Sequence, residues 1–586
     1  MDAEDQVKKY FDWIDYMVFA IMLIVSALVG VYFAFFAKIK QNTTSEYLMG
    51  GKTMGIFPIS MSLIASYISG ISLLGIPAEM YTYGTQFWMT LVSEVFVAII
   101  MGYAILPVFY QLKITSTYEY LNLRFSNTVR MLGTIMFLAK MLLYIPIVIY
   151  VPALAFSQVT GINLHLVTPV VCIVCIFYTT LGGLKAVVWT DTIQTAVMFG
   201  ALVITVVVGT ARVGGVKEVW KRNFEGGRIE FFEMDLDPTI RHSFWTVTIG
   251  NFFYWLASCS INQAMVQRCL AMPTLASARI TIGILVVGLW VLVSMCCYMG
   301  LVIYAYYQKC DPVTRGWIDK SDQLLPYFIM DTLGDIPGLP GMFVSGVFSA
   351  ALSSMSTGLN SMTGVIFEDL IKPRLKRPLT EAQASFLMKM IVATIGVICV
   401  GLVFVVEKLG TLIQAAGSIG AITAGPLLGV FCLGMFFPGA TPEGALVGGL
   451  LSGAFITWIS VGSQTDIAHG IIRFPQKSVS VEGCSADWVA DYLSITLSSD
   501  SPKKVPEAAF FLYRISYMYY TPLGTIGAIA IGLVVSYLTG YNKGKKLDKD
   551  VFSPVVQRLL RAQPPLDAGV DSILTTHMLT ELTGPL

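Results

Sequence analysis

The sequence contains few charged residues and almost no net charge. Of its 586 residues, 13% are Asp, Glu, Lys or Arg, and the formal net charge at pH 7 is +1. A chain of this kind has no basic field with which to neutralise phosphates, which excludes a module that binds DNA or RNA. Histidine is also scarce, and all four residues are expected in loops or tails: His165, His242, His469 and His577. A histidine proton relay and a histidine metal site are therefore excluded.

Signatures of catalytic chemistry are missing as well. No Walker loop, GxSxG elbow, HExxH pair or dinucleotide fingerprint occurs in a usable context, and no nucleophile–base pair accompanies the apolar segments. We therefore expect no enzymatic activity and no organic cofactor. The CxxC formed by Cys172 and Cys175 lies in an apolar run, where cysteine packs as a small hydrophobic side chain. Cys310 and Cys484 alone fall on predicted outer loops; a disulfide between them is open, because the sequence gives no distance.

Long apolar runs dominate what is present. Hydrophobic residues make up 55% of the chain, which is typical of an integral membrane protein. The runs are close to the ~20 residues that a helix needs to cross a bilayer. We predict thirteen spans, near residues 13–37, 57–83, 88–110, 131–156, 166–182, 187–208, 244–267, 280–307, 341–367, 386–406, 411–437, 442–461 and 521–539. An odd number of spans places the two termini on opposite sides of the membrane.

The orientation follows from positive charges in short loops, which stay on the cytoplasmic side. With the N-terminus outside, the inner loops hold Lys38, Lys40, Lys52, Lys113, Arg124, Arg130, Lys185, Arg268, Arg279, Lys372, Arg374, Lys376 and Arg377. The tail adds Lys543, Lys545, Lys546 and Lys549. We therefore predict an extracellular N-terminus and a cytoplasmic C-terminus.

Two predicted spans are interrupted by residues that disturb helices. Residues 57–83 contain Gly70, Gly75 and Pro77, and residues 244–267 contain a Gly-Asn pair followed by SCSINQ. Irregular backbone at membrane depth is tolerated only where other groups satisfy the freed polar atoms. Two polar, broken segments five spans apart are typical of an inverted-repeat transporter. The alternative is that these small residues serve only close helix packing.

The sixth predicted span carries an ionisable residue. Asp191 and Gln194 are three residues apart and share one helix face, and a carboxylate inside a span indicates a functional site by default. The alternative is a carboxylate at the inner membrane interface, because the nearby Trp189 is typical of an aromatic belt. Ser66 and Gln263, on the two broken segments, are the natural oxygen partners of Asp191. Three other charged residues within spans are interpreted as close enough to span ends to snorkel: Glu79, Glu94 and Lys140.

Residues 341–369 are long enough to span a bilayer yet are rich in hydroxyls. They include Ser345, Ser349, Ser353, Ser354, Ser356, Thr357, Asn360, Ser361 and Thr363. Buried hydroxyls need partners. One reading is that they join one helix to another, and the other is that they form an oxygen-rich site for a hard cation.

Five ordered segments together resemble the sodium:solute symporter family. They are SLIASYISGISLLG at 62–75, FYTTLGGLKAVVWTDTIQ at 177–194, NQAMVQR at 262–268, SAALSSMSTGLNS at 349–361 and AGPLLGVFCLGMF at 424–436. The resemblance runs from about residue 15 to 540. It implies a plasma-membrane, all-α symporter that uses sodium as its coupling ion and works by alternating access, with lipid and a small-molecule anion as its partners.

The fold that this resemblance implies is the five-plus-five inverted repeat of the LeuT type, with one extra helix before the core and two after it. The corresponding regions are an N-terminal segment (1–56), the first repeat (57–208), an extracellular loop (209–243), the second repeat (244–437), two additional helices with a long loop at 462–520 (438–540), and a cytoplasmic tail (541–586).

The resemblance also implies ion sites. By matched position, the conserved-type sodium site would consist of the carbonyls of Ala65, Ile68 and Ala350 with the hydroxyls of Ser353 and Ser354. Five neutral oxygens suit Na⁺, because they replace part of its hydration shell without the field strength that favours a divalent ion. A second sodium would be associated with Ser66, Asp191, Gln194 and Gln263.

Within the family, the chain looks most like the branch of monocarboxylate, iodide and multivitamin carriers. Ser72 and the Gln-Ala-Ala at 414–416 fit the monocarboxylate pattern, and the implied pocket would be walled by Ser69, Ser72, Tyr144, Trp255, Gln414 and Ser418. One departure is Thr82, where the branch usually has an arginine. A short-chain monocarboxylate is the expected substrate. The alternatives are iodide, biotin or pantothenate, and, from another class, a transport-inactive sensor on the same fold.

Overall fold

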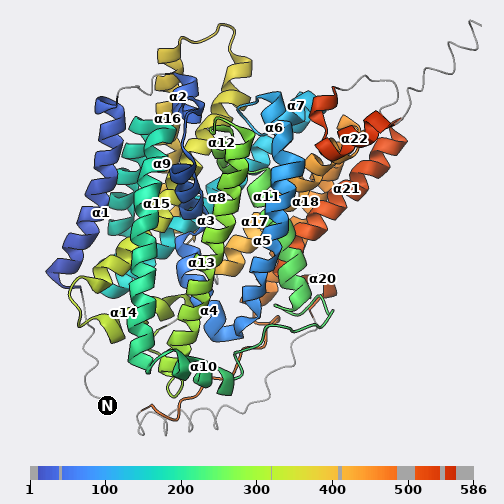
Figure 1. Cartoon of the computed structure of the whole chain (residues 1–586). Helices are drawn as coiled ribbons and strands as arrows, with labels where there is room; N and C mark the ends of the chain where they lie inside the picture. Colours follow the sequence, from blue (N-terminus) through green and yellow to red (C-terminus); the bar gives the residue numbers. More distant parts are fainter. Residues whose placement is uncertain are drawn as a thin grey trace, which may run out of the picture.

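The computed structural model describes residues 11–37, 43–318, 320–406, 412–484, 509–541 and 548–562. Side chains are not described at residues 406, 412–417, 419 and 560–562. Every regular element in the described ranges is helical, which confirms the predicted fold class (Figure 1). Several residues used to predict the orientation lie outside these ranges: Lys38, Lys40, Lys543, Lys545 and Lys546.

Long helices form the bundle, and short ones cap its two ends. The long helices and their broken counterparts are α1 (Trp13–Val31), α3 (Ile56–Tyr67), α4 (Gly70–Tyr83), α5 (Thr90–Ile100), α6 (Leu106–Leu112), α8 (Asn127–Thr160), α9 (Leu164–Val213), α11 (Asn251–Ser260), α12 (Gln263–Leu270), α13 (Leu275–Tyr307), α15 (Leu339–Val365), α16 (Glu381–Val406), α17 (Leu412–Phe436), α18 (Pro442–Ala468) and α21 (Tyr520–Leu538). The short helices are α2 (Thr44–Met49), α7 (Glu119–Arg124), α10 (Val216–Glu225), α14 (Leu324–Leu333), α20 (Phe511–Arg514) and α22 (Pro554–Ala562).

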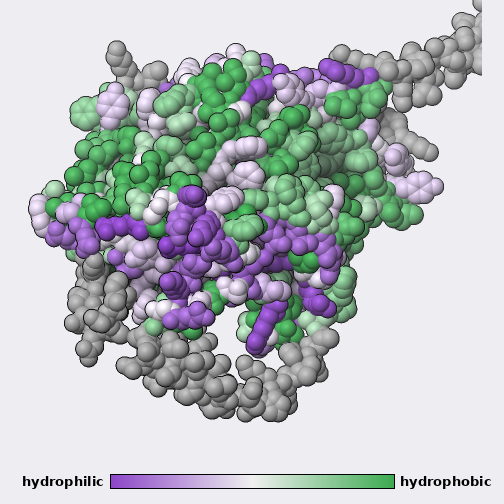
Figure 2. Space-filling view, turned by 60° about the horizontal axis from the view of Figure 1, so that its bottom comes forward, coloured by the Kyte–Doolittle hydropathy of each residue, from purple (hydrophilic) through white to green (hydrophobic). Residues whose placement is uncertain are grey.

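Nine helices in the described residues are long and apolar enough to cross a membrane, or ten if the bent pair of α2 and α3 counts as one span. The remaining predicted spans fall on the broken pairs α3/α4 and α11/α12, on α17, and on a second arm of α9. The number of thirteen crossings therefore stays a prediction. Hydrophobic residues cover the side of the bundle that is visible in Figure 2, and hydrophilic residues gather at the end that faces the viewer.

Helix α9 is two predicted spans joined by a tight turn. Its 50 residues would reach about 75 Å if straight, more than twice the ~30 Å hydrocarbon core. Gly183 has φ +54° and ψ −154°, and it breaks the helix. The first arm starts where His165 stacks on Phe404, with ring centroids 4.7 Å apart. The second arm returns past Ser26 of α1, to which the Gln194 amide donates at 3.2 Å. The glycine at the turn reverses the chain, so that each arm can cross the membrane separately.

The break between α3 and α4 is sharp. Helix α3 ends at Tyr67, Ile68 is extended with φ −86° and ψ 95°, and α4 begins at Gly70. A second break separates α11 from α12 at residues 261–262, where Asn262 caps the N-terminus of α12. Both broken pairs contact α15. Every residue of α15 except Met342 is buried, so this hydroxyl-rich helix is the centre of the bundle rather than a surface that faces lipid.

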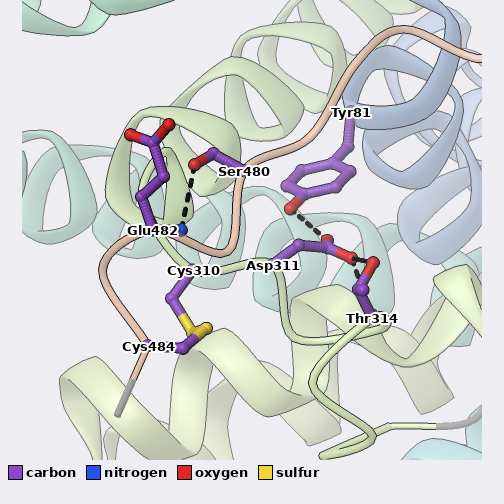
Figure 3. The surroundings of a disulfide bond; sticks show 7 residues. All are labelled: Tyr81, Cys310, Asp311, Thr314, Ser480, Glu482 and Cys484. Carbon is purple, nitrogen blue, oxygen red and sulfur yellow. Dashed lines mark hydrogen bonds between the residues drawn. A yellow bond between two sulfur atoms is a disulfide. The ribbon is translucent and has the colours of Figure 1, made fainter. Parts of the chain in front are cut away.

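The loop face is the end of the bundle formed by residues 214–243, 308–318, 320–338 and 470–484, at the bottom of Figure 1. A disulfide joins Cys310 to Cys484 with the Cα atoms 5.1 Å apart, which settles the pairing that the sequence left open (Figure 3). Next to it, the Tyr81 hydroxyl of α4 donates to Asp311 at 2.6 Å. The disulfide and this hydrogen bond together link residues 470–484 to the end of α4. Helix α1 begins at this face and α22 lies at the opposite end (Figure 1).

The turn of α9 gives the first testable prediction. A Cβ added at Gly183 would lie 2.9 Å from the Tyr47 carbonyl oxygen, in a backbone conformation that L-residues rarely adopt. We expect Gly183→Ala to destabilise the protein by about 1–3 kcal/mol. Gly200→Ala, on the same helix with no atom within 4 Å of the new Cβ, should be neutral or slightly stabilising. Thermal unfolding of purified protein in detergent measures both, and equal melting temperatures for the two variants would contradict this account of the turn.

Candidate functional site

The broken end of α3 faces the hydroxyls of α15. The last carbonyls of a helix have no partner within it, and in α3 these belong to the turn that includes Ala65 and Ser66. The Ser354 hydroxyl lies 3.0 Å from the carbonyl oxygen of Ala350 and 3.3 Å from that of Ser66. The Ser66 and Ser353 hydroxyls are 3.4 Å apart. All five residues predicted for the first sodium site are buried: Ala65, Ile68, Ala350, Ser353 and Ser354.

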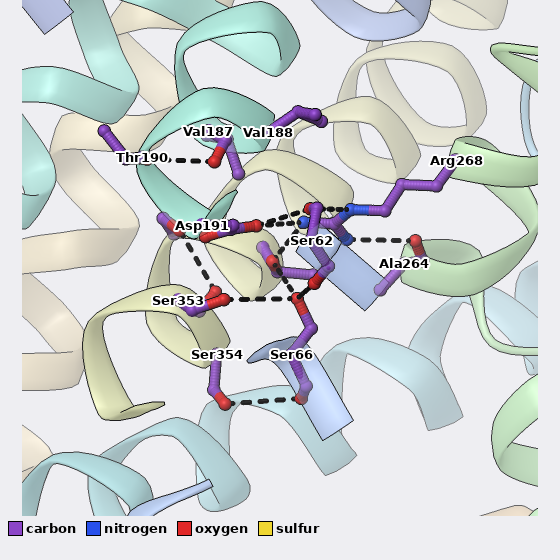
Figure 4. Close-up of polar contacts among 12 residues, drawn as sticks. Ser62, Ser66, Val187, Val188, Thr190, Asp191, Ala264, Arg268, Ser353 and Ser354 are labelled. Atoms are coloured by element: carbon purple, nitrogen blue, oxygen red, sulfur yellow. Dashed lines mark hydrogen bonds and ion pairs between the residues drawn. The ribbon is translucent and has the colours of Figure 1, made fainter. Parts of the chain in front are cut away.

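Asp191 lies beside this cluster and is fully buried. Its Oδ2 accepts a hydrogen bond from the Ser62 hydroxyl at 2.6 Å and an ion-paired one from Nη2 of Arg268 at 3.0 Å (Figure 4). The other carboxylate oxygen, Oδ1, has no hydrogen-bond partner among the described residues. The alternative of an interfacial carboxylate does not fit a residue with no exposed surface.

Arg268 is the functional residue that the sequence analysis misplaced. It was counted among the charges of inner loops, whereas its side chain is 2% exposed. Its Nε donates to the Ser62 hydroxyl at 2.8 Å, and its Nη2 also contacts Thr357. The Thr357 hydroxyl lies 2.8 Å from that of Ser66. The turn at 261–262 folds α12 back into the bundle, which brings Arg268 to Asp191. In the sequence, the one signal for this contact is that Arg268 directly follows the broken span at 244–267.

The two glutamines predicted for the second sodium site lie apart from the Ser66–Asp191 contact network. Gln194 donates through Nε2 to Ser26, while its Oε1 is buried without a partner among the described residues. Gln263 accepts from the amide and the hydroxyl of Thr117 at 2.7 and 2.8 Å, and it donates to the Thr115 carbonyl at 3.0 Å. Gln263 therefore anchors residues 115–117 in this structure, and its part in sodium binding stays a prediction.

A cavity of about 230 Å³ begins at the break between α3 and α4. Four of the six residues predicted for the substrate pocket line it: Ser69, Ser72, Tyr144 and Trp255. Ser66, Ser354 and Thr357 also line it, so the cavity and the oxygen cluster share a wall. Ser418 is buried and accepts a hydrogen bond from Gln464 at 3.1 Å. The side chain of Gln414 lies outside the described residues.

Glu94 and Lys140 also line this cavity, so the interpretation that they snorkel at span ends is wrong. Lys140 is the fourteenth residue of a 34-residue helix, and Glu94 is the tenth of a 28-residue helical segment. Both segments are longer than the predicted spans, and the two charges consequently lie deep between their ends. Glu79 is buried too, and its carboxylate pairs with Arg241 at 2.8 Å.

A compact polar cluster follows the cavity toward the loop face. Tyr517 lines the cavity, and its hydroxyl lies 3.3 Å from Nε2 of His242. Burial and, to a lesser degree, the neighbouring Arg241 guanidinium keep the pKa of His242 well below its usual value, so this imidazole is neutral at physiological pH. Arg241 is then the cation of the cluster, paired with Glu79.

Comparisons with known proteins agree with this arrangement. Residues 47–452 match the model of the Sodium:solute symporter family. A sodium-coupled monocarboxylate transporter 1 from Xenopus laevis is 41% identical over 90% of this chain and 85% of its own length. A sodium-dependent multivitamin transporter from Oryctolagus cuniculus is 39% identical over 96% of this chain and 88% of its own. The solved structure of a Na⁺-coupled sialic acid symporter shares the fold, with a TM-score of 0.73 at 23% identity over 91% of this chain and 99% of that one.

The buried ion pair gives the second prediction. Asp191→Asn leaves the Arg268 guanidinium buried without its counter-charge, and breaking such a pair costs about 3–5 kcal/mol. Arg268→Gln leaves the Asp191 carboxylate buried without its counter-charge. We expect the double variant to lose clearly less stability than the sum of the single losses, because no charge is then left unpaired. Thermal unfolding of the four proteins measures the coupling, and strictly additive losses would show that the pair is not formed.

Proposed function

Because this chain belongs to the sodium:solute symporter family, and is therefore a sodium-coupled membrane transporter and not an enzyme, we propose that it imports a short-chain monocarboxylate together with sodium. The observation that carries the proposal is the cavity at the broken helix. Hydroxyls, aromatic rings and a lysine that no described residue pairs with line it, next to a cluster of neutral oxygens. Sodium is the coupling ion.

The first sodium site in this proposal is formed by Ala65, Ile68, Ala350, Ser353 and Ser354. The contact of the Ser354 hydroxyl with the Ser66 carbonyl supports it, since this contact joins the broken end of α3 to α15. A sodium ion held there would fix α3 against α15 and satisfy carbonyls that the break leaves free. Binding would thus favour one arrangement of the broken helix over the other.

A second sodium at Asp191 would compete with Arg268. The guanidinium already neutralises the carboxylate at 3.0 Å, and two cations would repel each other at one buried carboxylate. Sodium binding there therefore requires Arg268 to withdraw. Arg268 itself lines the cavity, which gives its side chain space in which to move. Ser66, Gln194 and Gln263 would complete this site once the helices rearrange.

The size and lining of the cavity support a small carboxylate. Its volume of about 230 Å³ is below the ~300–1,000 Å³ of sites for drug-sized ligands. The Ser69 and Ser72 hydroxyls can donate to a carboxylate, and Ser69 stands at the N-terminus of α4, whose helix dipole favours negative charge. The side chains of Tyr144 and Trp255 offer aromatic surface to a short alkyl group.

A carboxylated vitamin is the second candidate substrate. The relative named a sodium-dependent multivitamin transporter is nearly as similar in sequence as those named monocarboxylate transporters. The pocket would have to widen for a ligand such as biotin or pantothenate. Both candidates share a carboxylate, so both use the same end of the pocket.

We further propose a plasma-membrane protein with the N-terminus outside and the C-terminus inside. The disulfide between Cys310 and Cys484 on the loop face supports this orientation, because disulfides persist in oxidising compartments. With more than one Na⁺ per anion, transport would carry net charge, and the membrane potential would contribute about 2.3 kcal/mol per charge per 100 mV.

The sodium site gives the third prediction. Ser354→Ala removes one hydroxyl oxygen from the proposed ligands, and we expect the sodium concentration for half-maximal uptake to rise by about tenfold, the equivalent of ~1.4 kcal/mol. Ser361→Ala is the matched control, because among the described residues that hydroxyl bonds only the Gly358 carbonyl of its own helix. Uptake of a radiolabelled substrate over a range of sodium concentrations measures both. An unchanged half-maximal sodium concentration in Ser354→Ala would reject this site, and equal uptake in sodium and in choline buffer would reject sodium coupling altogether.

The substrate gives the fourth prediction. In voltage-clamped cells that express the protein, we expect lactate and butyrate to evoke inward current in sodium buffer, because their carboxylate matches the donors of the pocket. Glucose and myo-inositol should evoke none. Biotin and iodide distinguish the alternatives. A response to biotin alone supports the vitamin carrier, and a response to iodide alone supports the iodide carrier. A sodium current without uptake of any radiolabelled solute would instead favour the transport-inactive sensor.

A further inference from the structure

The cavity wall carries three charged side chains, and they differ in how they are paired. They are Glu94, Lys140 and Arg268. The Arg268 guanidinium is held by Asp191, Ser62 and Thr357. Glu94 and Lys140, in contrast, form no hydrogen bond or ion pair with any residue that the structure describes. The cavity therefore holds one cation and one carboxyl group that no described residue engages.

These two groups come from different helices and line the same cavity. Glu94 belongs to α5 and is 4% exposed, and Lys140 belongs to α8. Tyr144 is one helical turn after Lys140, and it also lines the cavity. Lys140 and Tyr144 thus present an ammonium group and an aromatic ring on the same face of α8.

An ionisable side chain without a partner is costly at this depth. Burying a charge that is neither paired nor hydrogen-bonded disfavours the folded protein, and such residues within membrane helices mark substrate or ion pathways. The cost is removed when a ligand supplies the missing partners. A ligand that fits must bring a negative group for Lys140 and a hydrogen-bond donor for Glu94.

We propose that Lys140 and Glu94 form a two-point recognition site for a carboxylate that bears a hydrogen-bond donor on the neighbouring carbon, such as a 2-hydroxy acid. The substrate carboxylate, to which the Ser69 and Ser72 hydroxyls donate in the proposed function, also pairs with the Lys140 ammonium. The hydroxyl on the adjacent carbon donates to the Glu94 carboxylate. Lys140 then supplies from within the cavity the positive charge that Thr82 does not offer at the end of α4. This inference rests on the proposed function and adds to it the residues that select among small carboxylates.

The Lys140 half of the site is tested with a charge-removing variant. We expect Lys140→Met to raise the lactate concentration for half-maximal sodium-dependent current by at least about tenfold, the usual effect of losing a charge-assisted hydrogen bond. Lys140→Arg keeps the charge and should stay within about threefold of the wild type. Lys389→Met is the matched control, since Lys389 lies on α16 and does not line the cavity. Surface biotinylation normalises each current to the protein delivered.

The Glu94 half is tested with lactate and propionate, which differ by the 2-hydroxyl group. We expect wild-type protein to favour lactate by about tenfold in half-saturation, because propionate leaves the Glu94 carboxylate without a donor. Glu94→Gln should bring this ratio close to one, mainly by weakening the response to lactate. Lactamide, a neutral amide of the same shape, should neither evoke current nor inhibit the lactate current of the wild type, a result that needs no variant to fold.

The outcomes separate this inference from the proposed function. If no monocarboxylate evokes sodium-dependent current in the wild type, the proposed function fails, and this inference fails with it. If lactate is transported but Lys140→Met leaves its half-saturation unchanged, or lactamide competes with it, the Lys140 assignment alone is overturned. If propionate and lactate are handled equally by the wild type, the Glu94 assignment alone is overturned.

Discussion

The structure depends on one constraint: a helix that breaks inside a membrane must find partners for its free backbone groups. In water the break after Tyr67 would cost little, but hydrocarbon offers no hydrogen bonds. The chain meets the constraint by placing the break against α15, which is buried almost throughout and presents one hydroxyl after another. The Ser354 hydroxyl bonds the carbonyl of its own helix at Ala350 and that of Ser66. The hydrogen bond to Ser66 joins the broken end of α3 to α15.

The same constraint explains how charges are distributed around the opening. Asp191 and Arg268 are almost fully buried, and they neutralise each other at 3.0 Å. Glu94 and Lys140 face the cavity, and no described residue pairs with them. Asp191 and Arg268 are thus paired within the protein, whereas Glu94 and Lys140 gain partners only when a ligand binds. In the account proposed here, sodium replaces Arg268 as the partner of Asp191, and the substrate binds Glu94 and Lys140.

Much of this arrangement could be predicted from the sequence, but contacts between distant segments could not. Apolar runs predicted the helical fold and the interrupted span at 57–83, and the resemblance implied that the hydroxyls of Ser353 and Ser354 lie beside it. Glu94 and Lys140 were misplaced because span ends were drawn from hydropathy, whereas helices continue past the apolar run. Arg268 was misplaced because the turn at 261–262 folds α12 back into the bundle. Gln263 was expected near Asp191, yet the local fold of residues 115–117 engages it. A periodic pattern reports which face is buried, not which of several polar partners it meets.

The central claim is that sodium binds between the broken end of α3 and α15. The most direct test is a pair of cryo-electron microscopy maps of the purified protein in lipid nanodiscs, one in sodium chloride and one in choline chloride. The account predicts a density peak in the sodium map alone, enclosed by the carbonyl oxygens of Ala65, Ile68 and Ala350 and the hydroxyls of Ser353 and Ser354. A sodium map without that peak, or the same peak in choline, would contradict it.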